Sequence, residues 1–291
     1  MTSAEWRGGG PAGRRPTISI IIATWNAAEA LPHTLRSIRS STGASLEWLV
    51  VDGASRDGTI DLLRANEDVI TWKSEPDKGI YDAWNKGSAR ATGDWLLFLG
   101  AGDEFVQGAP ATREATLSGA HPAHNIVYGR MQYLSPHHRH VIEEVGEPWE
   151  RLAGRWELMR PALPNTNAAF HHRSLFEAGM RFDPALSIAA DAELMLRAIA
   201  MKPPLYMPEI VSRSTVGGVS FRISSALQIR RQIREINRRL GLTPPLSHVI
   251  DDTLALAAKM AIGSCLPERA GHVVADALRA LQGKPRRWTV R

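Results

Sequence analysis

Four short apolar runs separated by helical patterns constrain the fold of the first hundred residues. The runs lie at 17–23, 46–51, 69–74 and 94–99, with helical patterns at about 28–39, 58–65 and 81–91. Parallel strands need crossover connections, usually helices, and they read as continuous apolar runs because both of their faces are buried. The alternation therefore predicts an α/β fold with a doubly wound, mostly parallel sheet. Such a sheet binds its ligand outside the carboxyl ends of the strands.

The pattern changes twice after this alternation. Shorter strand-like runs mix with helical patterns as far as about residue 222, which predicts an α+β elaboration on the same sheet. The remaining segments are helical by periodicity and predict a C-terminal helical appendage. The start of the chain is rich in Gly, Arg and Pro and predicts a disordered leader. The predicted divisions are a leader at 1–16, a domain at 17–222 with a nucleotide-binding half at 17–104 and an acceptor half at 105–222, and a helical region at 223–291.

Composition excludes several classes of protein. With 291 residues and 44% hydrophobic content, the chain can bury a core. The only cysteine, Cys265, excludes an internal disulfide and a four-cysteine zinc site, and it favours a reducing compartment such as the cytoplasm. The leader has no apolar run of signal-peptide length, and the apolar segment 253–265 is shorter than the roughly 18 residues that span a bilayer. The net charge of +5 favours anionic partners.

Polar residues follow the first two predicted strands. Those after the first strand are Thr24, Trp25 and Asn26, and Asp52 follows the second. A carboxylate at Asp52 can accept hydrogen bonds from a ribose hydroxyl or a base N–H. The alternative role, capping the next helix, suits Asp57 better because Asp57 directly precedes that helix. No G-x-G-x-x-G follows the first strand, which counts against a dinucleotide-dependent dehydrogenase and favours a nucleotide held in some other way.

The stretch 74–95 carries a second group of polar residues. Asp77 and Gly79 lie between the third predicted strand and its helix, and Asn85 lies on that helix. As a solvent-exposed helix surface these residues would be ordinary. Their position beside a strand end favours a ligand site.

The fourth run ends in the sequence GAGD, residues 100–103. Gly100 and Gly102 allow a sharp turn and a close approach of the backbone to a ligand. Asp103 then projects from the strand end, where it could bind a divalent cation, Mn²⁺ or Mg²⁺, that bridges two phosphates. A single carboxylate is enough, because Mg²⁺ takes its remaining ligands from phosphates and water. The alternative is that Asp103 only closes a turn or caps a helix.

Three segments together resemble family 2 glycosyltransferases of the GT-A fold. They are "ISIIIATWNAAEALPHTLRSI", "EWLVVDGASRDGT" and "DKGIYDAWNKGSARATGDWLLFLGAGD", which match in order over about 85 residues. The resemblance implies transfer of a sugar from a nucleotide-diphosphate donor. It places Thr24 and Asp52 at the nucleoside, Trp25 near the base or sugar, and Asp103 at the metal. The sequence departs from the family pattern at Gly53, which replaces a second aspartate, and at Gly100 and Gly102, which replace earlier carboxylates of the D-x-D-type motif.

An inverting transfer also needs a carboxylate that takes the proton of the acceptor hydroxyl. In the family, a run of the form D-x-[DE]-L-x-x-R after F-D carries this base, and Asp191 in "FDPALSIAADAELMLR" matches that position. The alternative is that Asp191 is the N-cap of the helix that it opens. The segment 214–222, with Ser220 and Arg222, resembles the mobile loop that closes over the diphosphate in this family, although an ordinary hairpin is an equal alternative.

The expected partners follow from the resemblance and from charge. We expect a nucleotide-sugar donor and a carbohydrate or polyprenyl-linked acceptor, as in cell-surface polysaccharide or glycolipid biosynthesis. The segment 222–239 has six arginines and one glutamate, which favours either contact with an anionic membrane from the cytoplasmic side or a solvated helix face. No nucleic-acid-binding motif accompanies the charge.

Two alternative functions stay open at this point. One is a nucleotidyltransferase that makes an activated sugar, although "TWNAAEA" after the first strand is not the Gly- and Lys-rich loop such enzymes use. The other is a non-catalytic protein that binds nucleotide sugars. The histidines at 121–125 and 135–140 do not have the spacing of a zinc site.

Overall fold

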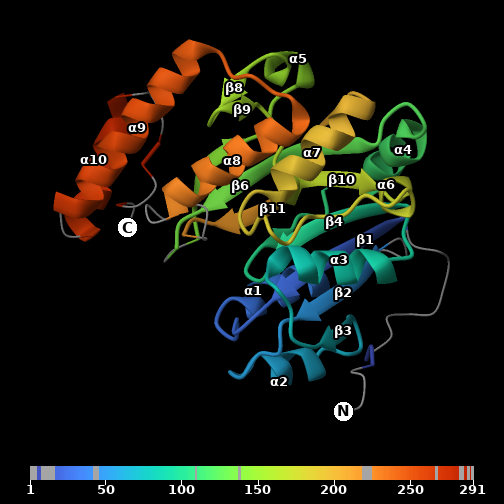
Figure 1. Ribbon diagram of the computed structural model, residues 1–291. Coiled ribbons are helices and arrows are strands. Elements are labelled where there is room, and N and C mark those ends of the chain that lie inside the picture. Colours follow the sequence, from blue (N-terminus) through green and yellow to red (C-terminus); the bar gives the residue numbers. More distant parts are fainter. Residues whose placement is uncertain are drawn as a thin grey trace. The chain divides into compact units, whose positions relative to one another are not determined.

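The computed structural model describes residues 5–7, 17–41, 46–108, 110–136, 139–217, 225–265, 268–281, 285–286 and 289. The chain forms two compact units. The first unit comprises Met1–Met131, Gly146–Trp149 and Pro164–Arg213. The second comprises Gln132–Val145, Glu150–Leu163 and Ser214–Arg291. Figure 1 labels the helices and strands.

A nine-stranded sheet organises the described chain, with strand order β3-β2-β1-β4-β10-β6-β11-β5 and β7 paired to β6. Its strands are β1 (Ile18–Thr24), β2 (Leu46–Asp52), β3 (Thr71–Ser74), β4 (Trp95–Gly100), β5 (Glu104–Phe105), β6 (Ile126–Leu134), β7 (Val141–Val145), β10 (Ala169–His172) and β11 (Leu205–Thr215). The first four strands run parallel. Strand β10 is antiparallel to both β4 and β6, and β5 is antiparallel to β11.

The first unit contains the three helices expected from the alternating pattern, α1 to α3, and further helices after them. They are α1 (Leu31–Ser40), α2 (Thr59–Arg64), α3 (Ile80–Arg90), α4 (Pro110–Ala120), α6 (Ser174–Glu177) and α7 (Ala190–Met201), with the short 3₁₀ helix η1 at Thr166–Ala168. The parallel strands joined by α1, α2 and α3 are visible as the blue to teal part of Figure 1. The predicted α/β fold class is confirmed, with a doubly wound, parallel-rich sheet and C-terminal helices.

The core of the first unit lies on both sides of the central strands. All seven residues of β1 are buried, as parallel strands covered on both faces require. Helix α3 packs on β1 and β2, and the Trp84 indole N–H donates to the Leu99 carbonyl at 3.0 Å. The Trp84 ring also contacts Phe98 and Phe182, with ring centroids 5.4 and 5.3 Å away. This aromatic cluster fixes α3 and the chain around Phe182 beside the end of β4.

The second unit holds the C-terminal helices α8 (Ala226–Leu240), α9 (Leu246–Cys265) and α10 (Glu268–Leu281). It also holds β8 (Trp156–Glu157), β9 (Arg160–Pro161) and all of α5 (Trp149–Leu152) except Trp149. The amide of Asn237 on α8 donates to the Met159 carbonyl at 2.7 Å. Arg279 on α10 pairs with Glu143 at 3.0 Å. Among the helices that are described, none has both the length and the apolarity to cross a membrane.

Part of the predicted leader is described. Arg7 forms an isolated antiparallel bridge with Trp72 on β3, and each residue donates its backbone N–H to the carbonyl of the other at 2.8 Å. Residues 1–4 and 8–16 lie outside the described residues.

Candidate active site

The parallel strands bring the predicted strand-end residues to one edge of the sheet. Thr24 at the end of β1 lies opposite Asp52 at the end of β2, and Asp52 lies opposite Ser74 at the end of β3. On the other side of β1, Ala23 lies opposite Gly100 at the end of β4. The carboxyl ends of these strands therefore line one edge, where sheets of this kind bind their ligands.

Asp52 is fully buried, and its carboxylate is engaged by neighbouring protein groups. One oxygen accepts from the Ser55 hydroxyl, and the other accepts from the Ser55 N–H at 2.9 Å and the Ser74 hydroxyl at 2.6 Å. The Gly53 N–H donates to the Thr24 carbonyl at 2.9 Å. In this structure Asp52 holds the loop after β2 in place.

The loops after β1 and β2 are fastened to each other. Asn26, with φ of 45°, accepts the Arg56 N–H on its side chain at 2.9 Å and donates its own N–H to the Ser55 hydroxyl at 2.7 Å. The Asp57 carboxylate accepts the Thr59 N–H at 3.0 Å at the first residue of α2 and the Ala28 N–H at 3.0 Å, whereas the N-cap position of α2 is Gly58. The hydrogen bond from the Thr59 hydroxyl is the main cause that lowers the pKa of Asp57.

Thr24 and Trp25 present different groups at this edge. The Thr24 side chain is 4% exposed, and its hydroxyl has no hydrogen-bond partner among the described residues. A buried hydroxyl without a protein partner is uncommon, so the Thr24 hydroxyl is available to hydrogen-bond a bound group. Trp25 is 68% exposed, so its ring is open to stack on a planar group.

Asp77 stands close to Gly53. One Asp77 oxygen accepts the Gly79 N–H at 2.8 Å, and Gly79 adopts φ of 106°, which favours glycine. The other oxygen lies 2.8 Å from the position that a Cβ on Gly53 would occupy. The carboxylate of Asp77 therefore fills the space next to residue 53 that a side chain there would need. Partial burial is the main cause that raises the pKa of Asp77.

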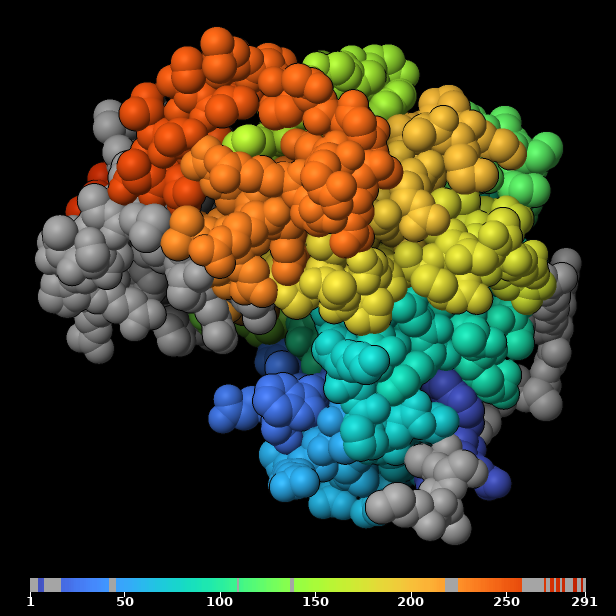
Figure 2. Space-filling model, viewed as in Figure 1, coloured from blue at the N-terminus to red at the C-terminus, as the bar shows by residue number. Residues whose placement is uncertain are grey.

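Asn85 acts as a link between α3 and the chain near Phe182. Its amide donates to the Phe182 carbonyl at 2.7 Å and accepts the Phe182 N–H at 3.0 Å. Figure 2 shows the cyan surface of α3 meeting the yellow surface that follows β10. Both hydrogen-bonding ends of the Asn85 side chain are thus used within the protein.

Asp103 closes the turn after β4. One of its oxygens accepts the Gly100 N–H at 2.8 Å and the Asn167 amide at 2.7 Å. Gly102 adopts φ of 96°, and its N–H donates to the Thr34 hydroxyl, which in turn donates to the Asp103 carbonyl at 2.7 Å. The turn that was one alternative for Asp103 is present, and it holds the carboxylate in a fixed orientation.

Asp191 is the second residue of α7 and lies half-buried. Its carboxylate accepts hydrogen bonds from the Tyr81 hydroxyl at 2.9 Å and the Thr166 hydroxyl at 3.3 Å. The N-cap of α7 is Ala189, so the alternative prediction that Asp191 is the N-cap is wrong. Burial, followed by the charge of Asp191, raises the pKa of Tyr81 well above 10, so this hydroxyl stays protonated as a donor.

Two consecutive residues of η1 connect Asp191 with Asp103. Thr166 donates to Asp191, and the next residue, Asn167, donates to Asp103. Sequence reasoning missed Thr166, Asn167 and Tyr81. The one signal available for the first two was the polar stretch "PNTN" just before the buried strand β10.

A metal at Asp103 would take a single protein carboxylate. The described residues contain no group of three or more His, Cys, Asp or Glu side chains placed to hold an ion. A donor set of one carboxylate plus phosphate and water oxygens suits Mg²⁺ or Mn²⁺, so the residues present fit a cation that arrives with a diphosphate. The predicted loop residues Ser220 and Arg222 lie outside the described residues.

Solved structures of other proteins share this fold. The fold resembles the mannosyltransferase PcManGT from Pyrobaculum calidifontis in complex with GDP-Man and Mn²⁺, with a TM-score of 0.60 and 18% identity over 96% of this chain and 84% of that one. It also resembles S. aureus TarS 1-349 in complex with UDP-GlcNAc, with a TM-score of 0.59 and 16% identity over 84% of this chain and 71% of that one. The chain spans 43% of the longer TarS chain. The fold is that of the GT-A glycosyltransferases.

Sequence comparison then gives the family. The model described as "Glycosyl transferase family 2" matches residues 19–132. The chain is 32% identical to the "PGL/p-HBAD biosynthesis glycosyltransferase" of Mycobacterium bovis and Mycobacterium tuberculosis over 239 residues, which cover 78% of this chain and 87% of the relative. The chain belongs to glycosyltransferase family 2, as its motifs predicted.

Proposed function

We propose that this glycosyltransferase is an inverting enzyme that moves a sugar from a nucleoside-diphosphate donor to a hydroxyl of a carbohydrate or lipid-linked acceptor. The observation that carries the proposal is the η1 link, in which Thr166 and Asn167 hold Asp191 and Asp103 from adjacent positions. An inverting transfer needs a base for the acceptor and a site for the leaving diphosphate close together. Asp191 and Asp103 suit these two roles.

Donor binding is proposed at the strand edge. The unpartnered Thr24 hydroxyl, the exposed Trp25 ring and the Asp77 carboxylate all lie at the ends of β1 and β3. The Trp25 ring suits stacking on a base or sugar, and Asp77 suits an N–H or hydroxyl donor. The solved relatives named above hold UDP-GlcNAc and GDP-Man, which is consistent with a nucleotide-sugar donor.

Asp103 is proposed as the protein ligand of Mn²⁺ or Mg²⁺. Such an ion, when bound, neutralises the charge that develops on the leaving diphosphate. Asn167 and the Gly100 N–H orient the Asp103 side chain for this contact. Replacement of Asp103 by Ala should abolish the Mn²⁺-dependent part of UDP or GDP binding in calorimetry. An unchanged affinity of Asp103→Ala for the nucleoside diphosphate in the presence of Mn²⁺ would mean that Asp103 only closes the turn after β4.

Asp191 is proposed as the general base. Its carboxylate takes the proton of the acceptor hydroxyl while the hydroxyl oxygen bonds to the anomeric carbon, and the electron pair of the breaking C–O bond leaves with the nucleoside diphosphate. Tyr81 and Thr166 donate hydrogen bonds that fix the orientation of Asp191.

The test of the whole proposal begins with the donor. A thermal-shift panel of UDP, GDP, dTDP and CMP, each with and without Mn²⁺, identifies the nucleotide. Release of that nucleotide from its sugar donors then measures turnover.

Asp191→Asn keeps the shape of the side chain and removes its basicity, so turnover should fall by about 10² to 10⁴-fold while donor affinity stays unchanged. The control is Asp61→Asn, which makes the same charge change at an exposed position of α2. Turnover by Asp191→Asn within a few-fold of wild type would overturn the base assignment.

The acceptor pathway and location are also proposed. One relative is named for PGL/p-HBAD biosynthesis, which is consistent with a role in glycolipid or cell-surface polysaccharide synthesis.

For the location, we propose that the enzyme works in the cytoplasm with α8 in contact with anionic lipid. The exposed side chains of Leu227, Arg231 and Arg234 support this proposal. Several other α8 arginines are paired within the unit, for example Arg230 with Asp252. Co-sedimentation with phosphatidylglycerol vesicles that is unaffected by replacing Arg231 and Arg234 with Gln would contradict this placement.

A further inference from the structure

Helix α9 presents a row of apolar side chains to the solvent. Leu246, Ile250 and Leu254, the apolar row, are 74%, 51% and 64% exposed. Their spacing of four residues places them on one face of the helix, one turn after another. Val249 and Leu256 are only partly exposed, so α9 packs within the second unit through a different face. Single exposed apolar residues are ordinary, whereas a contiguous group marks a surface that binds a partner.

Helix α8, which precedes α9 in the chain, presents a cationic face. Leu227, Arg231 and Arg234 are exposed and lie on one side of α8, because they are separated by four and three residues. Within the described part of the chain, neither Arg231 nor Arg234 has an ion-pair or hydrogen-bond partner. Arg238 differs, because it pairs with Glu235 at 2.7 Å. The positive charge of Arg231 and Arg234 therefore stays available to an external anion.

The apolar row and the cationic face adjoin where the two helices touch (Figure 1). The Arg230 guanidinium on α8 donates to the Thr253 hydroxyl on α9 at 2.5 Å. Thr253 directly precedes Leu254 and lies one turn after Ile250, so it borders the apolar row. Arg230 directly precedes Arg231 on α8. The contact between Arg230 and Thr253 thus joins the two faces into one surface of the second unit, which we call the α8–α9 surface.

The α8–α9 surface has the chemistry of a helix pair that lies on an anionic bilayer. Apolar side chains can enter the boundary between headgroups and acyl chains, and guanidinium groups bind lipid phosphates. Of the two acids on this part of α9, Asp252 lies 3.4 Å from Arg230, and Asp251 lies about 100° around the helix from Ile250. A second copy of the chain suits the surface less, because a twofold contact would bring the same positive charges together.

We infer that the α8–α9 surface docks on the anionic lipid of a membrane leaflet, with the apolar row inserted and Arg231 and Arg234 at the level of the phosphates. The inference rests on the proposed contact of α8 with anionic lipid, and it names the element that enters the membrane. Arginine contacts weaken as salt rises, whereas the burial of apolar area does not depend on charge. The apolar row therefore supplies the part of the binding that salt does not screen.

The experiment measures co-sedimentation of the full chain with phosphatidylglycerol vesicles. The triple variant Leu246→Ser, Ile250→Ser and Leu254→Ser should weaken binding at least about tenfold, because the apolar area buried in the bilayer is lost. Arg231→Gln combined with Arg234→Gln should weaken binding about thirtyfold, since each cation near an anionic surface contributes to the attraction. Binding by the triple variant equal to that of wild type, or no binding by wild type, overturns the inference.

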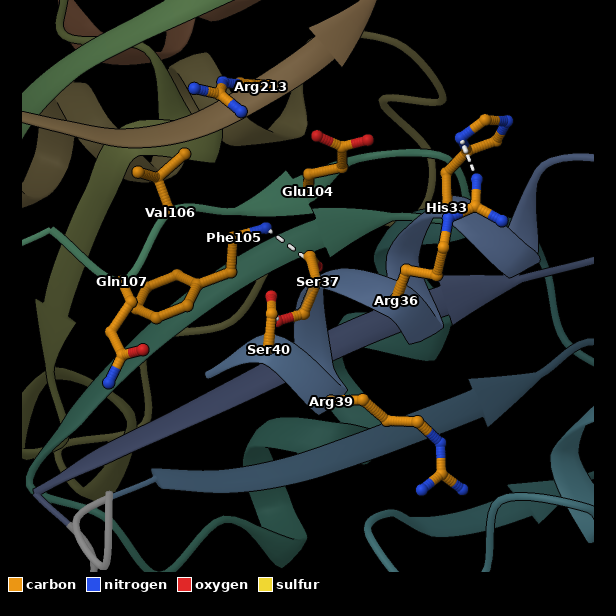
Figure 3. Close-up of a pocket in the computed structure, with 10 residues that line it drawn as sticks. All are labelled: His33, Arg36, Ser37, Arg39, Ser40, Glu104, Phe105, Val106, Gln107 and Arg213. Carbon is orange, nitrogen blue, oxygen red and sulfur yellow. Dashed lines mark hydrogen bonds between the residues drawn. The ribbon is translucent and has the colours of Figure 1, made fainter. Parts of the chain in front are cut away.

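Two control variants separate this surface from general effects. Arg36→Gln combined with Arg39→Gln makes the same change of charge at the same spacing on α1, where Figure 3 shows both side chains. Met201→Ser replaces an apolar residue of α7 that is 58% exposed. Both controls should bind the vesicles as wild type does. A loss in the α1 variant equal to that in the α8 variant would mean that the vesicles respond only to net charge, and would overturn the inference.

Sedimentation velocity without lipid tests a second copy as the occupant of the surface. Wild type and the triple variant should sediment alike. Their unfolding temperatures should also match, because exposed side chains contribute little to stability. If wild type is a dimer and the triple variant is a monomer, a second copy covers the apolar row and the inference is overturned.

Donor turnover separates this inference from the proposed function. Release of nucleoside diphosphate from the sugar donor in solution should be the same in wild type and the triple variant, because the α8–α9 surface holds none of the proposed catalytic residues. If wild type neither binds nor cleaves any donor, the proposed function fails. If donor turnover is normal and the triple variant binds vesicles as wild type does, only the docking inference fails.

Discussion

Asp52 and Asp191 are both carboxylates of the candidate site, yet they are held in different ways. Asp52 is fully buried and accepts hydrogen bonds from one backbone N–H and two serine hydroxyls. Asp191 is half-buried and accepts from two hydroxyls, those of Tyr81 and Thr166. The first arrangement fixes a loop, and the second orients an accessible group. The position of a carboxylate after a strand or at the start of a helix does not distinguish these two roles. The number and kind of its hydrogen-bond donors distinguish them.

The largest stability effect is expected at Asp52. Replacement by Ala leaves the Ser55 N–H and the Ser55 and Ser74 hydroxyls without their acceptor, and we expect a loss of about 3 kcal/mol in the free energy of unfolding. Urea denaturation measures the loss, and Asp61→Ala is the exposed control. A loss below about 1 kcal/mol together with abolished nucleotide binding would return Asp52 to the ligand role that its position predicts.

A smaller effect is expected at Tyr81. The Tyr81→Phe substitution keeps the ring, which stacks on Phe182 with centroids 5.7 Å apart, and removes one donor to Asp191. Turnover should fall about tenfold with donor affinity unchanged, because the base is less well oriented. Steady-state kinetics with the identified donor separates these two quantities. If KM for the donor rises and kcat does not change, Tyr81 belongs to donor binding and the contrast between Asp52 and Asp191 weakens.

The smallest effect is a coupling between Gly53 and Asp77. The Gly53→Ala substitution places a methyl group 2.8 Å from the Asp77 carboxylate, which must move. We expect each of Gly53→Ala and Asp77→Ala to weaken binding of the nucleoside diphosphate. The double variant should be less impaired than the sum of the two, by about 1 kcal/mol. Calorimetry on the four proteins measures the coupling. If the losses of binding free energy in the two single variants simply add in the double variant, the contribution of Asp77 to binding does not depend on the small residue at position 53.

The parallel half of the fold could be predicted from sequence because its signals are local. β2 begins at the predicted residue, and β1 and β4 begin one residue later than predicted. β3 begins two residues later than the apolar run, because the backbone N–H groups of Val69 and Ile70 still bond to Asn66 in the turn after α2. The antiparallel strands were harder to predict. The strand-like runs of that part of the sequence are short, whereas β11 extends from Leu205 to Thr215.

The candidate site was predicted in part. The order of strand ends, and with it the placing of Thr24, Asp52 and Asp103 along one edge, follows from the topology of parallel sheets. The partners of Asp191 could not be predicted, because Tyr81 lies 110 residues away in sequence and meets it only through packing of α3. The same holds for Asn167, which is 64 residues from Asp103.

The bridge between Arg7 and Trp72 has a consequence for solubility. β3 is the edge strand of the sheet, and its outward N–H and C=O groups at Trp72 are the ones that Arg7 occupies. An uncovered edge offers a template to which a strand of another molecule can add. A chain that begins at Thr17 would lack Arg7 and would leave the N–H and C=O groups of Trp72 uncovered. We expect such a chain to associate more readily through this edge. The bridge from Arg7 thus covers part of an edge that would otherwise be open to such association.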